Sequence, residues 1–454
     1  MMKCVPYLAA FAAAFTSVQA GLNLDAVNNV AVYWGQNSVN TLGTGHQERL
    51  SYYCESADEV DVYILSFITM YNGLGGYPET NFANAGNNCT TFDGTELLDC
   101  PQIAEDIVTC QGLGKTILLS TGGGTYTEGG FTSEAEATEF ANLVWEVFGP
   151  VSDNSSVLRP FGTAVVDGFD FDFENLEMSN MPTYANQLRS LYETDTSKTY
   201  YLTAAPQCVY PDEADGPMLA GTVYFDAIWI QFYNNGCGIS SFTAGSETQW
   251  NFNFDTWDNW AKTVSLNPNV RVMMGVPGNT GAGGGYEPPA TIGEVIDYVI
   301  DNNYTSFGGI MVWDASQAWE NTGFISSVYA YLPTGTSTPS PTTSTVVTSS
   351  TSTTSSSTST STTLITTTAP TTTSTTTTSS STTTSTAPTS TSSTCPVAGA
   401  SCSNSGEYRC TGSSFGICDN GAWVIQSCPS GDVCVQDGSS LYCAASGSSE
   451  PVCA

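Results

Sequence analysis

The segment Asp167–Glu174 places three carboxyl side chains at alternate positions, a spacing that suits acid–base chemistry. Because successive side chains of a β-strand point to opposite faces, Asp170, Asp172 and Glu174 fall on one face. Phenylalanines occupy the other face, at Phe169, Phe171 and Phe173. Burial and mutual repulsion both oppose ionisation of such a row, so the carboxyl pKa values should rise. Carboxyls of this kind perform acid–base catalysis, and the pattern indicates a catalytic strand.

Two plainer interpretations of the carboxyl row fit the sequence less well. A solvated acidic strand explains the carboxyls but not the three phenylalanines opposite them. A calcium-binding loop needs glycine at its sixth position, where Asp172 stands. Asp167 has the opposite parity to the row, so we expect it to have a structural role.

The elements that must position this strand are visible as apolar runs separated by helix-like stretches. Strand-like runs occur at Val30–Trp34, Val60–Ile68, Lys115–Ser120, Gly168–Phe173, Tyr200–Ala205, Ala227–Phe232, Arg271–Val276 and Gly308–Trp313. The clearest helical stretches are Ser133–Phe148 and Thr291–Ile300. Strands that alternate with helices predict parallel pairing, and eight such units predict a (β/α)8 TIM barrel of the α/β class. A doubly wound open sheet is the alternative.

In such a barrel the catalytic groups lie at the carboxyl ends of the strands. Glu174 follows the fourth run, and Asp172 and Asp170 lie successively deeper. Tyr233 follows the sixth run and Trp313 ends the eighth, where a phenol and an indole suit sugar binding but also ordinary packing. The glycines after the third run suit a backbone that approaches a ligand, which makes Gly124 a candidate substrate-binding position.

The position of the carboxyls also bears on mechanism. Most glycosidases need two carboxylates on opposite sides of the scissile bond, whereas these carboxyls share one strand. This favours a route in which a 2-acetamido sugar attacks its own anomeric carbon. Glu174 would be the general acid, Asp172 would orient the amide N–H, and Asp170 would share a proton with Asp172. Tyr233 would donate to the attacking carbonyl oxygen.

Composition points to a secreted protein. Residues 1–20 have the features of a signal peptide, with Lys3, an apolar run and a small-residue cleavage pattern, and no later stretch is apolar enough for a membrane span. After Cys4, six cysteines lie between Cys54 and Cys237 and eight between Cys395 and Cys453, even numbers that suit disulfides. Three sequons, Asn88, Asn154 and Asn303, allow N-glycosylation.

The formal net charge of −34 argues against nucleic acid as a partner. With a single histidine, His46, and no Cys-x-x-Cys pair, a zinc site is not indicated, and we expect neither a metal nor a cofactor. A neutral polymer suits this surface better.

Composition also divides the chain. Residues 21–332 would form the barrel, and residues 333–394 are a Ser/Thr-rich linker that we expect to be O-glycosylated. Residues 395–454 hold eight cysteines and predict a small disulfide-rich module, for which 105 disulfide connectivities are open.

The segment Asp167–Glu174 matches the D-x-x-D-x-D-x-E signature of glycoside hydrolase family 18. Other motifs, in the same order, resemble the plant and fungal class III chitinases: Tyr33–Asn37, Ser120 with Gly122 and Gly123, Ala205–Cys208, Gln231–Asn235 and Trp313. The resemblance spans about Asn29 to Leu332. The short connection between Val276 and Gly308 leaves no room for the inserted domain of deeper relatives, which favours an open, endo-acting cleft.

This resemblance implies an endochitinase that hydrolyses β-1,4-linked N-acetylglucosamine with retention, using Glu174 as acid and then as base toward water. It implies that Asp172 assists the acetamido group and that Tyr233 holds its carbonyl. It places further residues along the sugar sites: Tyr33, Gln36, Gln231, Asn234 and Trp313. The family's cysteine pattern implies the disulfides Cys54–Cys110, Cys89–Cys100 and Cys208–Cys237.

The C-terminal segment resembles the fungal chitin-binding module of family 19, with Tyr408, Trp423 and Tyr442 as candidate stacking residues that could equally fill a small core. The expected protein is therefore a monomeric, secreted enzyme of the extracellular space or cell wall whose partners are chitin and chitin oligomers. The alternatives are a non-catalytic chitin-binding lectin, an endo-β-N-acetylglucosaminidase on N-glycans, and a cell-wall structural protein, which would not explain the carboxyl row.

Overall fold

The computed structural model describes residues 21–43, 45–152, 156–174 and 178–333, together with short stretches between 396 and 445: 396–397, 400–402, 408–412, 414–419, 422–427, 432–437 and 440–445. The expected signal peptide, the sequon at Asn154 and the linker after Pro333 lie outside these residues. The chain divides into two units, Met1–Val347 and Thr348–Ala454, which are described separately.

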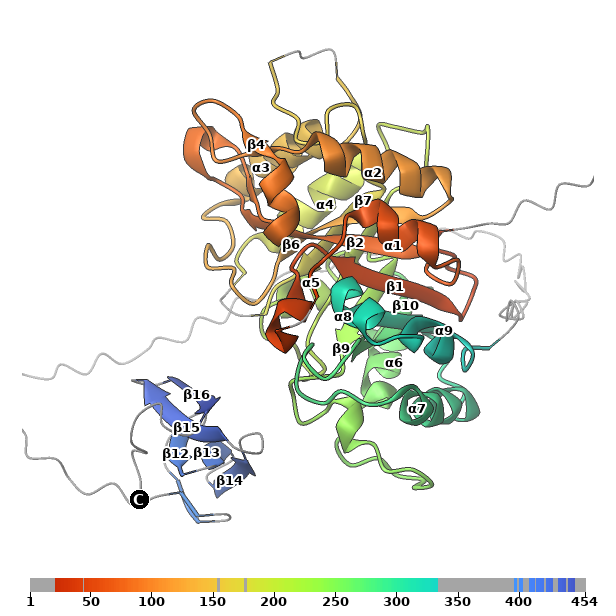
Figure 1. The fold of residues 1–454 in the computed structure, drawn as a ribbon, viewed down its shortest axis with the longest axis vertical. Helices are drawn as coiled ribbons and strands as arrows, with labels where there is room; N and C mark the ends of the chain where they lie inside the picture. The colour runs from red at the N-terminus through yellow and green to blue at the C-terminus, as the bar shows by residue number, and fades with distance from the viewer. Residues whose placement is uncertain are drawn as a thin grey trace, which may run out of the picture. The chain divides into compact units, whose positions relative to one another are not determined.

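The first unit contains a closed barrel of eight parallel strands (Figure 1). The strands are β1 Asn29–Trp34, β2 Val62–Met70, β6 Thr116–Gly122, β7 Gly168–Asp172, β8 Tyr201–Ala204, β9 Ala227–Gln231, β10 Arg271–Pro277 and β11 Phe307–Trp313. β1 pairs in parallel with both β2 and β11, and this second pairing closes the sheet. The predicted TIM barrel is confirmed, and the open-sheet alternative is excluded because the barrel has no free edge.

Helices surround the barrel strands (Figure 1). They are α1 Leu50–Ser56, α2 Pro101–Gly112, α3 Glu134–Phe148, α4 Met181–Tyr192, α5 Gly216–Leu219, α6 Phe254–Thr263, α7 Pro289–Asp301, α8 Ala315–Glu320 and α9 Phe324–Tyr329. Ser133 begins α3 as its N-cap, because its side chain accepts a hydrogen bond from the Glu136 amide. The connection from β10 to β11 holds α7 as its single α-helix, as its short length predicted.

Shorter strands and 3-10 helices lie within the loops. They are the two-residue strands β3 Glu79–Thr80, β4 Thr90–Thr91 and β5 Leu98–Asp99, and the 3-10 helices η1 Ser38–Leu42, η2 Leu74–Gly76, η3 Ala83–Asn88 and η4 Ile239–Ser241. The helices that the structure describes include none that is both long and apolar enough to span a bilayer.

The alternation predicted for β7 separates two cores. The phenylalanines Phe169, Phe171 and Phe173 are buried in the larger apolar cluster, which also takes in the inner faces of the helices. A smaller cluster fills the barrel itself and includes Tyr33, Trp229 and Met311. The carboxyls of β7 therefore point into the barrel because the phenylalanines occupy the layer under the helices.

Asp167 lies at the amino end of β7 and has a structural role. Its carboxylate accepts hydrogen bonds from the Ile117 amide at 2.8 Å and from Gln111 Nε2 at 2.9 Å. It also forms an ion pair with Lys198, at 2.7 Å. These contacts join β7 to β6 and to α2 at the end of the barrel opposite the carboxyl row.

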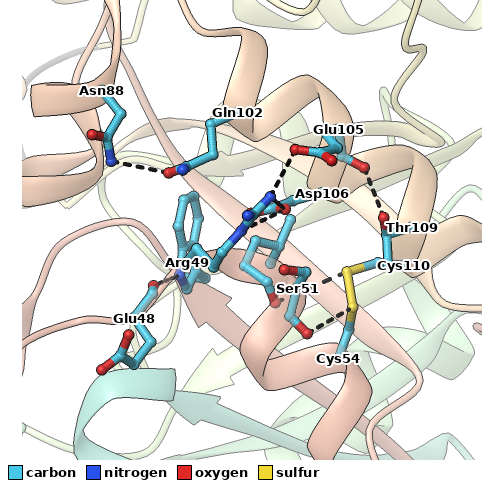
Figure 2. Close-up of polar contacts among 12 residues, drawn as sticks. Glu48, Arg49, Ser51, Cys54, Asn88, Gln102, Glu105, Asp106, Thr109 and Cys110 are labelled. Carbon is cyan, nitrogen blue, oxygen red and sulfur yellow. Dashed lines mark hydrogen bonds and ion pairs between the residues drawn. A yellow bond between two sulfur atoms is a disulfide. The ribbon is translucent and has the colours of Figure 1, made fainter.

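A disulfide and a charge cluster fasten α1 to α2 (Figure 2). Cys54 is bonded to Cys110, and Arg49 Nε donates to both carboxylate oxygens of Asp106, at 2.9 and 3.1 Å. The Asp106 side chain is almost fully buried, so the guanidinium compensates a charge that water cannot reach. Glu105 completes the cluster from the exposed side of α2.

The structure contains all three disulfides that the resemblance implied in the first unit. Besides Cys54–Cys110, they are Cys89–Cys100 and Cys208–Cys237. The last of these fastens the segment after β8 to the segment after β9.

The described stretches of the second unit contain short antiparallel strands. β12 Tyr408–Thr411, β13 Ser414–Asp419 and β14 Ala422–Ser427 form one sheet, and β15 Asp432–Asp437 and β16 Ser440–Ala445 form a hairpin. A disulfide between Cys410 and Cys434 joins the sheet to the hairpin. Trp423 is buried, with the Arg409 guanidinium carbon 5.9 Å from its ring centre. The side chains of Tyr408 and Tyr442 lie outside the described part, so a stacking role for the three aromatics stays a prediction.

Candidate active site

Asp170, Asp172 and Glu174 rise in that order from the interior of the barrel to its carboxyl-terminal rim. Asp170 is fully buried, Asp172 is 3% exposed, and Glu174, which follows β7, is half-buried. The strand register places Ser120 beside Asp170 and Gly122 beside Asp172. The three carboxyls thus form the predicted column, with the outermost one accessible to a ligand.

Four donors from four different strands converge on Asp170. Its Oδ2 accepts from Tyr33 Oη at 2.6 Å and Ser120 Oγ at 2.7 Å. Its Oδ1 accepts from Thr203 Oγ1 at 2.5 Å and Trp229 Nε1 at 2.8 Å. Burial raises the pKa of Asp170, whereas these hydrogen bonds lower that pKa because they favour the ionised form. A carboxylate has about four acceptor positions, so Asp170 is saturated as an anion.

Asp172 has a different environment. Its Oδ1 accepts a hydrogen bond from Gln231 Nε2, at 2.8 Å. Burial raises the pKa of Asp172 well above its ordinary value, and the nearby charges of Glu174 and Asp170 raise it further. The described residues include no hydrogen bond between Asp170 and Asp172, and the shared proton stays a prediction. The arrangement instead favours an ionised Asp170 beneath a protonated Asp172.

Glu174 lies where a proton donor would meet a ligand at the rim. Burial raises the pKa of Glu174, the Gln231 amide lowers it, and the charge of Asp212 raises it. Its backbone carbonyl accepts from Gln207 Nε2, at 3.0 Å. A methyl group built on Gly124 would lie 3.1 Å from Glu174 Oε2, so the backbone of the glycine loop passes close to this carboxyl.

Aromatic side chains form the wall of the site. The ring centres of Tyr33 and Trp313 are 5.5 Å apart, and Phe67 stacks on Trp313 at 6.1 Å with a 17° angle between the ring planes. Tyr233 is 5% exposed and packs in the same cluster. Burial, followed by the charges of Asp172 and Glu174, raises the pKa of Tyr233 well above its ordinary value, so its phenol keeps its proton and can donate it.

Two predicted sugar-binding residues, Gln36 and Asn234, form hydrogen bonds with backbone groups of neighbouring segments. Gln36 Nε2 donates to the carbonyls of Ser66 at 2.8 Å and Asn81 at 3.1 Å. Asn234, with a positive φ of 59°, accepts from the Gly284 amide through Oδ1, at 2.7 Å. These contacts hold the loops around the rim, and direct sugar contacts by either residue stay predictions.

Sequence reasoning missed part of the site. Thr203 and Trp229 have the inward parity of their strands, and that alternation could have identified them. Gln207 and Asp212 lie in the irregular segment after β8, where no periodicity applies. Their proximity to Glu174 depends on how the segment after β8 folds against the end of β7, which the sequence does not show.

Comparison with known proteins agrees with this geometry. Residues 29–282 match the family described as Glycosyl hydrolases family 18, and residues 351–439 match the Carbohydrate binding domain (family 19). The second match begins inside the segment expected to be a linker.

Two similar fungal proteins each match more than 70% of this chain. One, named "Class III chitinase", from Arthroderma benhamiae, is 51% identical over 341 residues, which are 74% of this chain and 96% of that protein. The other, named "Endochitinase 33", from Trichoderma harzianum, is 49% identical over 72% of this chain and 98% of that protein.

A solved structure with the same fold is the xylanase and α-amylase inhibitor protein XAIP-II from Scadoxus multiflorus. It has a TM-score of 0.53 and is 28% identical over 66% of this chain and 98% of its own. Because a protein so named has this barrel, the fold alone does not establish catalysis, which depends on the side chains of the site.

The buried Asp172 predicts a measurable effect on stability. Its pKa is raised in the folded state, so its contribution to stability is present below the unfolded pKa of about 4 and is lost as pH rises through the folded pKa. Asp172→Asn removes this titration. We expect the substitution to raise the melting temperature at pH 7 by about 2 °C or more and to change it little at pH 4, measured by calorimetry.

The matched control for this prediction is Asp93→Asn, at an exposed turn between β4 and β5, which should have little effect at either pH. A variant Asp172→Asn that is less stable than the wild type at pH 7 but not at pH 4 would contradict the assignment.

Proposed function

The chain belongs to the glycosyl hydrolases family 18, and from this premise we propose that it is an endochitinase that cleaves β-1,4-linked N-acetylglucosamine polymer with retention. The observation that carries the proposal is the position of Glu174. It is a half-buried acid with a raised pKa at the barrel rim, directly above Asp172 and near Tyr233. The match to a carbohydrate binding domain and the names of the two fungal relatives support chitin as the substrate.

The proposed mechanism uses the substrate's own acetamido group. Glu174 donates its proton to the leaving glycosidic oxygen while the acetamido carbonyl oxygen attacks the anomeric carbon. Asp172 accepts the amide N–H through the carboxyl oxygen that carries no proton, and Tyr233 donates to the attacking carbonyl oxygen. Ionised Glu174 then takes a proton from water, which opens the cyclic intermediate and restores the original configuration. Trp313 provides the apolar floor for the sugar at the reacting position.

A chitin-binding lectin on the same barrel is the alternative from another class. The inhibitor named above shows that this fold also occurs in proteins named for other roles. The intact column of Asp170, Asp172 and Glu174 favours the enzyme, because a binding protein has no use for an acid with a raised pKa at the rim above two buried carboxyls. An endo-β-N-acetylglucosaminidase is the closer alternative, and the C-terminal match to a carbohydrate binding domain speaks against it.

We further propose that the protein is secreted, is a monomer, and acts on chitin in the fungal cell wall. Three disulfides in the first unit suit an oxidising compartment, and both relatives named above come from fungi. The second unit would keep the barrel close to insoluble polymer.

The first prediction from this mechanism concerns the general acid. Glu174→Gln removes the proton donor and keeps the shape of the side chain, so hydrolysis of chitotetraose should fall by roughly 10²- to 10⁴-fold in a reducing-end assay. The variant should have a melting temperature no lower than that of the wild type and should bind insoluble chitin normally. Near-normal turnover would refute the assignment of the acid.

The second prediction concerns the nucleophile. If the acetamido group attacks, a chitin hexamer should release new reducing ends as β-anomers, detectable by NMR before mutarotation. Cellohexaose, which lacks the acetamido group, should not be cleaved at a measurable rate. Release of α-anomers, or equal cleavage of both polymers, would exclude the proposed route.

The third prediction concerns the second unit. A protein truncated after Leu332 should bind insoluble chitin roughly tenfold or more weakly, because it loses the second attachment point. Its turnover of chitotetraose should be unchanged, which serves as the internal control. Equal binding of the full and truncated proteins to insoluble chitin would rule out this role.

A further inference from the structure

A second acidic pair, Asp212 and Asp215, lies behind the site and has no part in the mechanism above. Both residues belong to the segment that follows β8 and leads into α5. Asp215 is fully buried, and in the described part of the chain neither of its carboxyl oxygens has a hydrogen-bond partner. An unpaired buried carboxylate would be very unfavourable, so Asp215 is present as the neutral acid.

Asp212 is paired with backbone amides and can therefore hold a charge. Its Oδ2 accepts from the Gln207 amide at 3.0 Å, and its Oδ1 accepts from the Asp215 amide at 2.7 Å. Its side chain is largely buried, at 7% exposure. Burial raises the pKa of Asp212, and the amide donors lower it because they stabilise the ionised form. Asp215 has no such donors among the described residues, so of the two carboxyls Asp212 is the one that carries the negative charge.

Gln207 connects this carboxylate to the general acid. Its Nε2 donates to the backbone carbonyl of Glu174 at 3.0 Å, and its Oε1 accepts from Asn235 Nδ2 at 2.9 Å. Its own backbone amide is the group that Asp212 holds. A continuous path of hydrogen bonds therefore runs from Asp212 through Gln207 to the residue that carries the catalytic carboxyl.

The anchoring of this segment makes the path rigid. The neighbouring Cys208 forms a disulfide with Cys237, and its carbonyl accepts from Asn253 Nδ2 at 2.8 Å and from Trp257 Nε1 at 3.0 Å. Gln207 also forms a parallel bridge with Gln231, the residue that donates to Asp172. A shift of Gln207 would therefore be transmitted to Glu174 and Asp172 together.

We propose that Asp212 is a positioning residue for the hydrolytic reaction: through Gln207 it fixes the backbone of Glu174, and its charge keeps the Glu174 carboxyl protonated. This inference rests on the proposed role of Glu174 as general acid. Burial is the main cause that raises the pKa values of both Glu174 and Asp172, and the charge of Asp212 raises both further, in agreement with this geometry.

Other titratable groups also surround the site. They are Asp170 and Asp172 on β7, Tyr33 on β1, Tyr233 after β9, Asp215 before α5 and Asp314 after β11. A test must therefore isolate the charge of Asp212 from these neighbours.

The test compares carboxyl-to-amide changes within one segment by the pH dependence of kcat on chitotetraose. The fall of kcat at high pH, the alkaline limb, reports the loss of the Glu174 proton. Without the negative charge of Asp212 this proton is lost more easily, so in Asp212→Asn the alkaline limb should move to lower pH by about 0.5 to 1 unit. Glu213→Gln removes an exposed charge next to Asp212 and should leave the limb in place, because water screens it. Asp215→Asn should also leave the limb in place, because Asp215 is already neutral.

Gln207→Ala separates position from charge. It removes the donor to the Glu174 carbonyl and keeps the charge of Asp212, so kcat should fall roughly tenfold without a shift of the alkaline limb. Thermal unfolding checks that each variant is folded, and Asp212→Ser, which keeps a hydroxyl acceptor, replaces Asp212→Asn if that variant does not fold.

The proposed electrostatic role would be overturned if the alkaline limb did not move in Asp212→Asn. It would also be overturned if the limb moved as far in Asp215→Asn as in Asp212→Asn. A wild-type kcat in Gln207→Ala would overturn the positioning role. Glu174→Gln is measured in parallel to separate the two hypotheses. If Glu174→Gln stays active, the proposed function itself fails. If Glu174→Gln is inactive but Asp212→Asn has a wild-type pH profile, only the inference about Asp212 is refuted.

Discussion

The structure depends on one buried anion at the centre of the barrel. Asp170 is held by four hydrogen bonds, whose donors Tyr33, Ser120, Thr203 and Trp229 come from β1, β6, β8 and β9. Desolvation of a lone carboxylate would cost several kcal/mol, and only a complete set of donors offsets that cost. Five of the eight strands therefore meet at one carboxylate. The negative charge of this carboxylate raises the pKa of Asp172, which lies above it.

Above this anion the other carboxyls cannot all be ionised. Asp172 and Glu174 lack the donors that saturate Asp170, and burial and the neighbouring negative charges raise the pKa of both. The result is an ionised base layer beneath groups that retain protons, a division of roles set by hydrogen bonding rather than by residue type. The phenylalanine face of β7 keeps this column rigid, because it locks the strand into the apolar layer under the helices.

The same barrel occurs in a protein named as an inhibitor of xylanase and α-amylase, so the scaffold does not decide the chemistry. The case for catalysis in this chain depends on the combination of the carboxyl column, the phenol of Tyr233 and the aromatic wall around Trp313. The Asp212–Gln207 path connects the general acid to a residue outside β7. Asp212, in the segment after β8, acts on Glu174 through backbone hydrogen bonds and through its charge.

The sequence alone determined the strand runs, the inward parity of the β7 carboxyls and the separation of a cysteine-rich tail, because alternation and composition are local properties of a chain. It also placed Glu174, Tyr233 and Trp313 at strand ends, where parallel strands must meet. It could not show the four donors around Asp170, the engagement of Gln36 and Asn234 with backbone, or Asp212 behind Glu174. Those contacts join residues dozens of positions apart, and they depend on strand register and loop geometry, which only the closed barrel decides.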